Sequence, residues 1–245
     1  SILRPSPVRL AVYLHDLISV IYARRYPGHT SRLRDAYYQA VYRQTLRHAD
    51  LVFTNTEFTR REILDWTAQR RLRCPPIQIA GYGFPPPVPP RPKQDVIILL
   101  VRHTPHKRSD LAVPYVYRWQ KTSGYTGRII CVGSLPAGIR MPEDPAWSWA
   151  GRVTPDAMLR MMGEARAVLH FTDYEGFGMP PVEAALAGSC PVFSAIPVAR
   201  EVMGSCGLGF DNDRYESFQH AMDQALQTPD ATVTGWATAL YERHH

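Results

Sequence analysis

Apolar runs alternate with helical patterns along the chain, and this alternation predicts a protein of parallel strands and helices. In the first third of the chain, apolar runs predict strands at residues 10–14, 51–54 and 77–80. Apolar positions at helical spacing predict helices at residues 31–48 and from Thr56 to about Thr67, with Thr56 as N-cap. Strands that alternate with helices are typical of parallel β units.

The same pattern starts again at Asp95 and runs through a second half. Residues 95–101 form a continuous apolar run, as a strand buried in a parallel sheet requires. Further strands are predicted at 128–132, 147–150, 167–171 and 191–194, and helices at 110–121, 155–165, from 180 onward and 215–227. These elements suffice for a complete doubly wound domain.

A proline-rich segment separates the two halves. Six of the nine residues from Phe84 to Pro92 are proline, which excludes a helix or central strand and favours an extended spacer. We therefore expect a first domain at 1–83, a linker at 84–94, a second domain at 95–230 and a last helix starting in 231–245. The first half has about three predicted strands where a doubly wound domain usually has five or six. We expect that domain to be incomplete and the chain to be a piece of a longer protein.

One motif in the second half combines a glycine turn with two carboxylates. Glu175 and Glu183 stand eight positions apart, with Gly-Phe-Gly at 176–178 between a predicted strand and a helix. Such a turn presents backbone N–H groups and a helix N-terminus to an anion. Carboxylates would repel a phosphate, so their expected partners are hydroxyl groups. A phosphate flanked by hydroxyls describes a sugar nucleotide; the alternative is a helix-entry turn with two solvated acids.

The Glu-x7-Glu spacing around Gly-Phe-Gly resembles the retaining GT-B glycosyltransferases of family 4, the group 1 transferases. The segments at 149–154, 190–194 and 200–202 resemble the family's flanking sequences. The resemblance implies two Rossmann-like domains, with the last helix crossing back to the first. It also implies that Glu175 contacts the donor sugar and that Glu183 binds the ribose hydroxyls. The backbone amides that would approach sugar and phosphate are those of Gly176, Phe177, Gly178 and Met179.

Three other segments fall where this family has donor-site residues. Arg102 and Lys107 follow the strand predicted to end at Val101, where the family places an Arg and a Lys on the donor diphosphate. Two cations there can neutralise charge on the leaving nucleotide. His15 matches the family's cleft histidine, which can hydrogen-bond a sugar hydroxyl or accept a proton. Gly83 matches a glycine turn that faces the donor.

Each of these assignments has a plainer alternative. The cations could form a solvated basic turn, His15 could be an ordinary loop residue, and the glycine turn could be only a turn. His103, Pro105 and His106 depart from the family's usual residues in the basic loop, and Arg108 could replace Lys107. Asp16, after His15, suits an orienting partner or a helix cap.

Metal ligands are not expected. Residues 211–213 read Asp-Asn-Asp, like the D-x-D motif of the GT-A fold, but they precede the last predicted helices, where Asp213 suits an N-cap. His103 and His106 lack a third ligand nearby. Cys131 and Cys190 lie in or beside apolar runs and are expected to be buried and reduced. We expect no cofactor, because the nucleotide sugar is a substrate.

The charge balance indicates an anionic partner. The chain has 28 Lys and Arg against 22 Asp and Glu, a net charge of +6. The predicted helix at 31–48 carries four Arg and three Tyr, which suits an anionic membrane surface; an amphipathic helix with a solvated face is the alternative. No basic tract of the RNA-binding kind is present, so nucleic acid is not expected. No apolar run approaches 18 residues, so no transmembrane helix is expected.

The resemblance implies a metal-independent, retaining hexosyltransferase of surface polysaccharide biosynthesis. The donor would be a nucleoside-diphosphate sugar, with GDP-mannose as first guess, and the acceptor a glycan or lipid-linked glycan. Residues 15–18 look most like bacterial mannosyl- and rhamnosyltransferases. The expected location is the cytoplasm, with peripheral contact at the inner face of the membrane. The alternatives are an epimerase or phosphorylase of the same fold, or a non-catalytic nucleotide-sugar-binding fragment; an incomplete first domain would bind donor but transfer sugar poorly.

Overall fold

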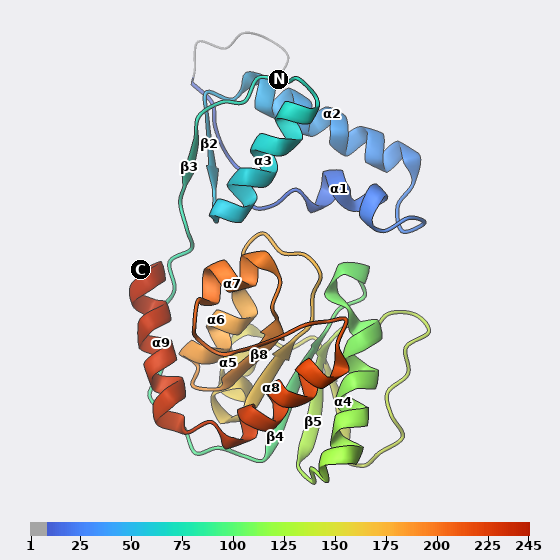
Figure 1. Cartoon of the computed structure of the whole chain (residues 1–245), viewed down its shortest axis with the longest axis vertical. Coiled ribbons are helices and arrows are strands. Elements are labelled where there is room, and N and C mark those ends of the chain that lie inside the picture. Colours follow the sequence, from blue (N-terminus) through green and yellow to red (C-terminus); the bar gives the residue numbers. More distant parts are fainter. Residues whose placement is uncertain (1–8) are drawn as a thin grey trace. The chain divides into compact units, whose positions relative to one another are not determined.

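The computed structural model describes residues 9–245; the first eight residues, and with them the start of the first predicted domain, lie outside the described residues. The chain forms two compact units (Figure 1). Unit 1 contains the chain up to Tyr82 together with Glu175–Phe177, and unit 2 contains Gly83–Tyr174 and Gly178–His245. Each unit is built on a parallel sheet, so the predicted α/β class is confirmed.

Unit 1 is a three-stranded parallel sheet with three helices. The strands β1 (Ala11–Tyr13), β2 (Leu51–Thr54) and β3 (Ile77–Ile79) lie in chain order, and the helices are α1 (Ile18–Arg25), α2 (Arg32–His48) and α3 (Glu57–Gln69). The predicted N-cap is confirmed, because the N–H of Thr59 donates to Thr56 Oγ1 at 3.1 Å. The sequence analysis missed α1, whose start is held by Asp16: its Oδ1 accepts the N–H of Ile18 at 2.8 Å.

Unit 2 is a six-stranded parallel sheet in the order β6-β5-β4-β7-β8-β9. The strands are β4 (Val96–Val101), β5 (Arg128–Gly133), β6 (Trp147–Gly151), β7 (Ala167–His170), β8 (Cys190–Ser194) and β9 (Leu208–Phe210). The helices are the 3-10 helix η1 (Pro105–Lys107), α4 (Ser109–Ser123), α5 (Pro155–Glu164), α6 (Met179–Leu186), α7 (Pro197–Met203), α8 (Tyr215–Gln227) and α9 (Asp230–His244). This arrangement is the doubly wound fold that the alternating pattern predicted.

The central strand β4 is buried on both faces, because successive side chains of a strand point to opposite sides. Ile97 and Leu99 pack into a large core with residues of α4 and α8, including Phe218. Val96 and Ile98 pack into a smaller core with residues of α5 and α6. Two packed faces explain why β4 is a continuous apolar run rather than an alternating one.

Three short elements of unit 2 were not predicted, and one predicted cap is wrong. The helix η1 has three residues, the helix α7 has seven and the strand β9 has three, too few for a clear period. Arg214, not Asp213, is the residue before α8, and no side chain caps that helix. The backbone N–H of Asp213 instead donates to Asp211 Oδ1 at 3.0 Å, so this segment is a local turn.

The proline-rich segment has no regular secondary structure, but it packs against unit 2 rather than standing apart as a spacer. The N–H of Val88 donates to the carbonyl oxygen of Leu186 at 3.0 Å. Lys93 donates through Nζ to the carbonyl oxygens of Gly163 and Gly188, at the ends of two different helices. Burial lowers the pKa of Lys93, as expected for an ammonium group held among carbonyl oxygens.

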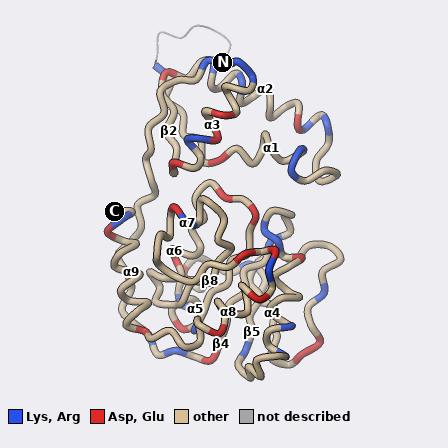
Figure 2. Tube along the Cα trace, in the orientation of Figure 1, with Lys and Arg blue, Asp and Glu red and all other residues tan. Residues whose placement is uncertain are grey.

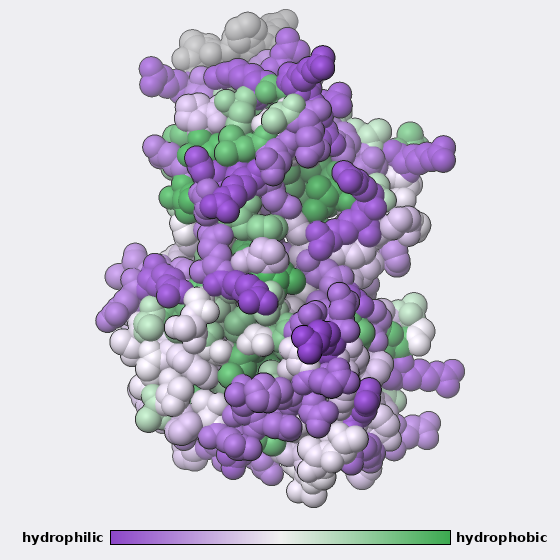
Figure 3. Space-filling view, viewed as in Figure 1, coloured by the Kyte–Doolittle hydropathy of each residue, from purple (hydrophilic) through white to green (hydrophobic). Residues whose placement is uncertain are grey.

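Charged residues of both signs are scattered over both units (Figure 2). Hydrophilic side chains cover most of the face drawn in Figure 3, and apolar side chains appear between them. None of the helices in residues 9–245 is both long and apolar enough to cross a membrane. Cys131 and Cys190 are buried as free thiols, and burial raises the pKa of each to about 12.

Candidate functional site

A pocket of about 330 Å³ lies in unit 2 at the carboxyl ends of the strands. It forms where the strand order reverses, since β4 has β5 on one side and β7 on the other. Ligands of open α/β sheets bind at such a switch point. The lining comes from β4, β5 and β7 and from α5 and α6: Leu100, Arg102, Lys107, Val132, Gly133, Arg152, Val153, Pro155, Met158, Met162, His170, Phe171, Pro180 and Glu183.

The pocket brings together three residues that the sequence analysis selected, namely Arg102, Lys107 and Glu183. They come from different parts of the fold: the loop after β4 and the middle of α6. Two cations and a carboxylate thus share one cavity whose remaining lining is largely apolar. Arg152 and His170 add polar groups that the sequence analysis did not select, although both stand at the end of a predicted strand.

Glu183 is a half-buried carboxylate, and burial raises its pKa. Desolvation disfavours the charged form, and no charged neighbour is among the causes of the shift. A carboxylate held at such a cost is suited to accept hydrogen bonds from a ligand's hydroxyl groups.

Gly133 shapes the pocket through close backbone packing. Its φ is 121°, and a Cβ atom at this position would collide with the carbonyl oxygen of Val101 on β4. Only glycine fits there. The backbone of β5 can therefore end beside β4 at the mouth of the pocket.

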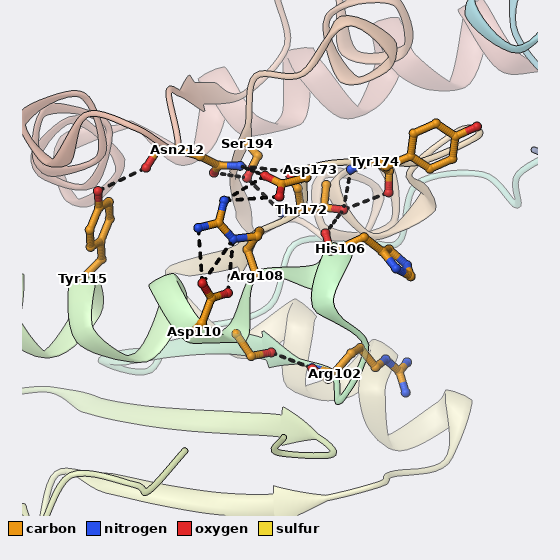
Figure 4. A network of polar contacts seen from close by, with 11 residues as sticks. Arg102, His106, Arg108, Asp110, Tyr115, Thr172, Asp173, Tyr174, Ser194 and Asn212 are labelled. Atoms are coloured by element: carbon orange, nitrogen blue, oxygen red, sulfur yellow. Dashed lines mark hydrogen bonds and ion pairs between the residues drawn. The ribbon is translucent and has the colours of Figure 1, made fainter. Parts of the chain in front are cut away.

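Arg108 follows Lys107 in the chain, and its guanidinium points toward Asp110 and Asp173 (Figure 4). It adopts the left-handed conformation, with φ 42°, between η1 and α4. Its guanidinium donates to Asp110 Oδ1 at 3.1 Å and to Asp173 Oδ1 at 3.0 Å. Both carboxylates occupy it, so the structure gives no support to the alternative that Arg108 replaces Lys107.

Buried hydrogen bonds join the basic loop to the chain that follows β7. The carbonyl oxygen of His106 accepts Thr172 Oγ1 at 2.9 Å and the N–H of Asp173 at 2.7 Å. The Nδ2 group of Asn212 donates to the carbonyl oxygen of Thr172 at 2.9 Å and to Asp173 Oδ1 at 3.0 Å. Ser194 Oγ donates to Asn212 Oδ1 at 2.7 Å (Figure 4).

This network holds the loop of Arg102 and Lys107 against three strand ends. The loop itself is closed by Ser109, whose Oγ accepts from the N–H of Arg102 at 2.9 Å and donates to its carbonyl oxygen at 2.8 Å. The sequence analysis missed Asn212, which is buried at the centre of the network. In the Asp-Asn-Asp segment it is therefore Asn212, between the two aspartates, that has a structural role, because its side chain bonds to Thr172, Asp173 and Ser194.

In unit 1, His15 lies in a cluster of aromatic and amide groups. Its Nδ1 is 2.5 Å from Tyr82 Oη, and the two rings are stacked at a centroid distance of 5.9 Å. The Tyr13 ring lies 4.7 Å from the His15 ring on a tilted plane. Asn55 Nδ2 donates to the carbonyl oxygen of His15 at 3.0 Å and to Tyr82 Oη at 3.3 Å.

These contacts favour one tautomer of His15. The carbonyl contact fixes Nδ2 of Asn55 as the donor, so Tyr82 Oη accepts from Asn55 and can donate its own proton to His15 Nδ1. When Tyr82 donates to Nδ1, the neutral imidazole carries its proton on Nε2, and Nε2 is then a hydrogen-bond donor.

The first part of the glycine motif also belongs to unit 1. The carbonyl oxygen of Gly176 accepts Thr56 Oγ1 at 2.8 Å and Thr59 Oγ1 at 3.2 Å. A Cβ atom on Gly176 would collide with the carbonyl oxygen of His15, so this glycine is required by a close backbone approach. The Phe177 ring meets the Tyr82 ring edge-on at 5.0 Å.

The selected residues are therefore distributed over two groups. His15, Glu175, Gly176 and Phe177 belong to unit 1, whereas Arg102, Lys107, Glu183, Gly178, Met179 and Gly83 belong to unit 2. Gly178 precedes α6 with φ 84°, and Met179 begins the helix with 41% of its surface exposed. Gly83 does not line the pocket, and nothing lies within 4 Å of a Cβ built on it.

The structure also bears on the metal alternatives. Within residues 9–245, His, Cys, Asp and Glu side chains form no group of three that could hold a metal ion. The roles of the selected residues toward a donor stay predictions.

Comparison with known proteins shows which family part of the chain is similar to. Residues 145–235 match the model of the glycosyl transferases group 1 family. A segment of 71 residues is 35% identical to the O-antigen chain mannosyltransferase RfbU of Salmonella typhimurium strain LT2; it covers 29% of this chain and 20% of RfbU.

Solved structures show the same fold over nearly the whole chain. The crystal structure of TarM superposes with a TM-score of 0.71 at 14% identity, over 96% of this chain and 46% of TarM. Anabaena HepE, solved in complex with UDP and glucose, gives a TM-score of 0.71 at 17% identity, over 96% of this chain and 68% of HepE. This chain thus spans less than half the length of TarM. Residues 145–235 of this chain are thus similar to the glycosyl transferases group 1 family, and the chain has the GT-B fold that the sequence predicted.

Proposed function

We propose that the protein takes part in transfer of a hexose from a nucleoside-diphosphate sugar to a glycan or lipid-linked glycan. The observation that carries the proposal is the shared pocket of Arg102, Lys107 and Glu183 at the switch point of the sheet. The two cations suit a diphosphate and the carboxylate suits ribose hydroxyls. Structures of the same fold support the ligand class, because HepE was solved with UDP and glucose and an E. coli trehalose-6-phosphate protein with UDP-2-fluoro glucose.

The proposed reaction retains the configuration of the sugar. The bond between C1 of the sugar and the diphosphate oxygen breaks, and a bond forms from C1 to the acceptor oxygen. The proton of the acceptor hydroxyl passes to the leaving diphosphate. Arg102 and Lys107 stabilise the negative charge of that leaving group. The hydrogen bonds that hold their loop to the ends of neighbouring strands keep both side chains in position before the reaction.

We propose that this charge stabilisation does not require a metal ion. The two cations of the pocket can offset much of the diphosphate charge by themselves. Nucleoside diphosphate binding should therefore survive EDTA, measured by calorimetry with and without the chelator. An affinity that falls on chelation and returns with added magnesium or manganese would contradict this.

The donor should be identified first. UDP, GDP, dTDP and ADP are compared by thermal shift, and the best is measured by calorimetry; a ligand at 100 times its dissociation constant stabilises by about 2.7 kcal/mol. GDP is our expectation, because RfbU is named a mannosyltransferase. The corresponding sugar donor is then used in a transfer assay with this chain and with a longer chain extended at both ends. Absence of binding by all four would overturn the proposal, and binding without transfer by either chain would favour a non-catalytic nucleotide-sugar-binding protein.

We also propose a peripheral membrane contact through α2. Leu33, Tyr37 and Val41 are spaced four residues apart on this helix and are 85%, 63% and 37% exposed. Arginines at 32, 34, 43 and 47 stand on the same helix. Exposed apolar side chains with basic neighbours suit an anionic lipid surface. Leu33→Ser/Tyr37→Ser should reduce cosedimentation with vesicles containing phosphatidylglycerol, with wild-type binding to neutral vesicles as the reference; equal binding by both proteins would remove α2 from the contact.

A further inference from the structure

Two buried hydroxyl groups at the start of α3 hold the backbone of the glycine motif. The carbonyl oxygen of Gly176 accepts hydrogen bonds from Thr56 Oγ1 at 2.8 Å and from Thr59 Oγ1 at 3.2 Å. The two threonines are 2% and 0% exposed. A buried polar group that loses its partner pays a desolvation cost, so the pair of bonds holds this carbonyl group in one direction.

The hydroxyl of Thr59 differs from that of another buried threonine in the same helix. Thr67 Oγ1 donates to the carbonyl oxygen of Ile63 at 3.0 Å, which is the usual bond of a helical threonine to its own helix. Thr59 donates instead to a carbonyl group 117 residues away in the chain. Thr56 has two roles, because its oxygen also accepts the N–H of Thr59 as the N-cap of α3. The hydroxyl of Thr59 therefore allows the contact with Gly176 to be tested without removing the cap.

Two further contacts restrict the same short segment. A Cβ atom on Gly176 would collide with the carbonyl oxygen of His15, so the backbones approach closely there. The ring of Phe177 is 4% exposed and meets the ring of Tyr82 edge-on at a centroid distance of 5.0 Å. The peptide bond between Gly176 and Phe177 is thus held on both sides, and it cannot turn without breaking several contacts.

The fixed carbonyl also fixes an N–H group. The peptide between Gly176 and Phe177 is trans, and in a planar trans peptide the C=O and N–H groups point in opposite directions. The carbonyl group points toward Thr56 and Thr59, so the N–H of Phe177 points away from them. Glu175 is the residue before Gly176, and the same anchor limits where its carboxylate can lie.

We propose that Thr56 and Thr59 are positioning residues for the hexose of the donor. They hold the peptide so that the N–H of Phe177 can donate to a sugar oxygen and Glu175 can accept from a sugar hydroxyl. This inference rests on the proposed function. A segment that is ordered before binding loses less conformational freedom when the sugar binds, which strengthens binding. The two hydroxyls should therefore affect the affinity for the sugar and not that for the nucleotide.

The test compares nucleotide sugars with their nucleoside diphosphates. GDP and GDP-mannose, and UDP and UDP-glucose, are titrated by calorimetry into the whole chain and into Thr59→Val, which removes the hydroxyl and keeps a β-branched side chain. For the pair that binds, the variant should bind the nucleotide sugar about fivefold more weakly, the loss expected for one neutral hydrogen bond. Its affinity for the nucleoside diphosphate should not change.

Two matched variants separate positioning from folding. Thr59→Ser keeps the hydroxyl and should restore the affinity for the nucleotide sugar. Thr67→Val removes a buried hydroxyl of the same helix that bonds to the carbonyl oxygens of Ile63 and Leu64, and it should leave that affinity unchanged. An equal loss in Thr59→Val and Thr67→Val, or an equal loss for nucleoside diphosphate and nucleotide sugar, would overturn the proposal.

A second measurement needs no ligand. In the 13C-labelled chain, the carbonyl signal of Gly176 should move in Thr59→Val and stay in place in Thr67→Val; an unmoved signal in both would reject the anchor. If nucleoside diphosphate binds and Thr59→Val binds the nucleotide sugar as the wild type does, the inference fails and the proposed function stands. If neither a nucleoside diphosphate nor a nucleotide sugar binds, the proposed function fails and the sugar role with it.

Discussion

The two units hold their candidate functional groups in different ways. In unit 2, the loop of Arg102 and Lys107 is fastened by buried hydrogen bonds through Thr172 and Asn212 to neighbouring strand ends. In unit 1, His15 is exposed and is held by the Tyr82 hydroxyl and by ring contacts. A buried polar network fixes a geometry tightly, because each unpaired member would be costly. An exposed aromatic cluster orients a ring more loosely.

This difference matches what each part would have to do. Groups that stabilise developing charge gain most from being fixed beforehand. A histidine that contacts a sugar hydroxyl can tolerate some motion. The predictions below test the comparison, beginning with the largest effect.

The largest effect is expected from a side chain placed where the backbones of β4 and β5 lie in close contact in unit 2. Gly133→Ala puts a side chain against the carbonyl oxygen of Val101 at a positive φ, so it should destabilise folding by about 3 kcal/mol. Urea unfolding followed by circular dichroism measures this. The control is Gly235→Ala in α9, where nothing lies within 4 Å and alanine should stabilise the helix by up to about 1 kcal/mol. Equal stability of the two variants would mean that the mouth of the pocket is not rigid.

Loss of a pocket cation comes next. Arg102→Ala and Lys107→Ala should each weaken nucleoside diphosphate binding by about 2 kcal/mol, close to thirtyfold, and affect the nucleoside much less. Calorimetry with both ligands gives the comparison. Arg140→Ala, an exposed arginine outside the pocket, is the matched control. A nucleoside affinity that falls as far as the diphosphate affinity would assign these cations to folding or to the base.

Glu183→Gln should change binding and stability in opposite directions. Binding of nucleoside diphosphate should weaken about tenfold, because a hydrogen-bonding carboxylate is lost. Burial raises the pKa of Glu183 in the folded protein, so its contribution to stability is present below its ordinary value of 4.5 and is lost as pH rises through the raised pKa. The glutamine variant should thus be more stable than wild type at pH 7 and show no such gain at pH 3. A less stable variant at pH 7 would mean that the carboxylate is paired, and Glu216→Gln on the surface of α8 is the control.

A smaller effect is expected from loosening the network without touching the pocket. Arg108→Gln removes the ion pairs to Asp110 and Asp173, which are partly exposed and worth about 1 kcal/mol together. Nucleoside diphosphate binding should weaken about threefold through misplacement of the loop. Raising the salt concentration should weaken binding in parallel for wild type and variant, since Arg108 does not contact the ligand. If the nucleoside diphosphate affinity of the variant depended less on salt than that of the wild type, Arg108 would contact the diphosphate directly.

The smallest change in binding or folding energy is expected at His15, where the 15N NMR signals give the clearest readout. Tyr82→Phe removes the hydroxyl that faces Nδ1 and leaves the ring stacking in place. The 15N shifts of His15 should report the proton on Nε2 in the wild type and a mixture of tautomers in the variant. An identical tautomer in both would mean that Tyr82 does not orient the ring.

The sequence by itself determined most of the second unit. The run at 95–101, the helix spacing and the strand–turn–helix order at 167–186 each come from local pattern, and their positions were predicted nearly to the residue. Arg102, Lys107 and Glu183 were selected through the resemblance to the group 1 glycosyltransferases, and all three line one pocket of the fold. Short elements such as α1 and β9 escaped, since three to eight residues carry too little period.

Only the tertiary structure decided which charged side chains form ion pairs within the protein and which line the pocket. Arg108 and Lys107 are adjacent and equally basic, yet two carboxylates from different elements hold Arg108 while Lys107 lines the pocket. Asn212 lies 40 residues from Thr172 along the chain, and their hydrogen bond depends on the positions of β7, β8 and β9 in the sheet. Likewise no local pattern joins Thr59 to Gly176, which lie 117 residues apart in the chain. Local sequence sets periodicity and turns, whereas the pairing of polar groups is set by which segments the folded chain brings within hydrogen-bonding distance.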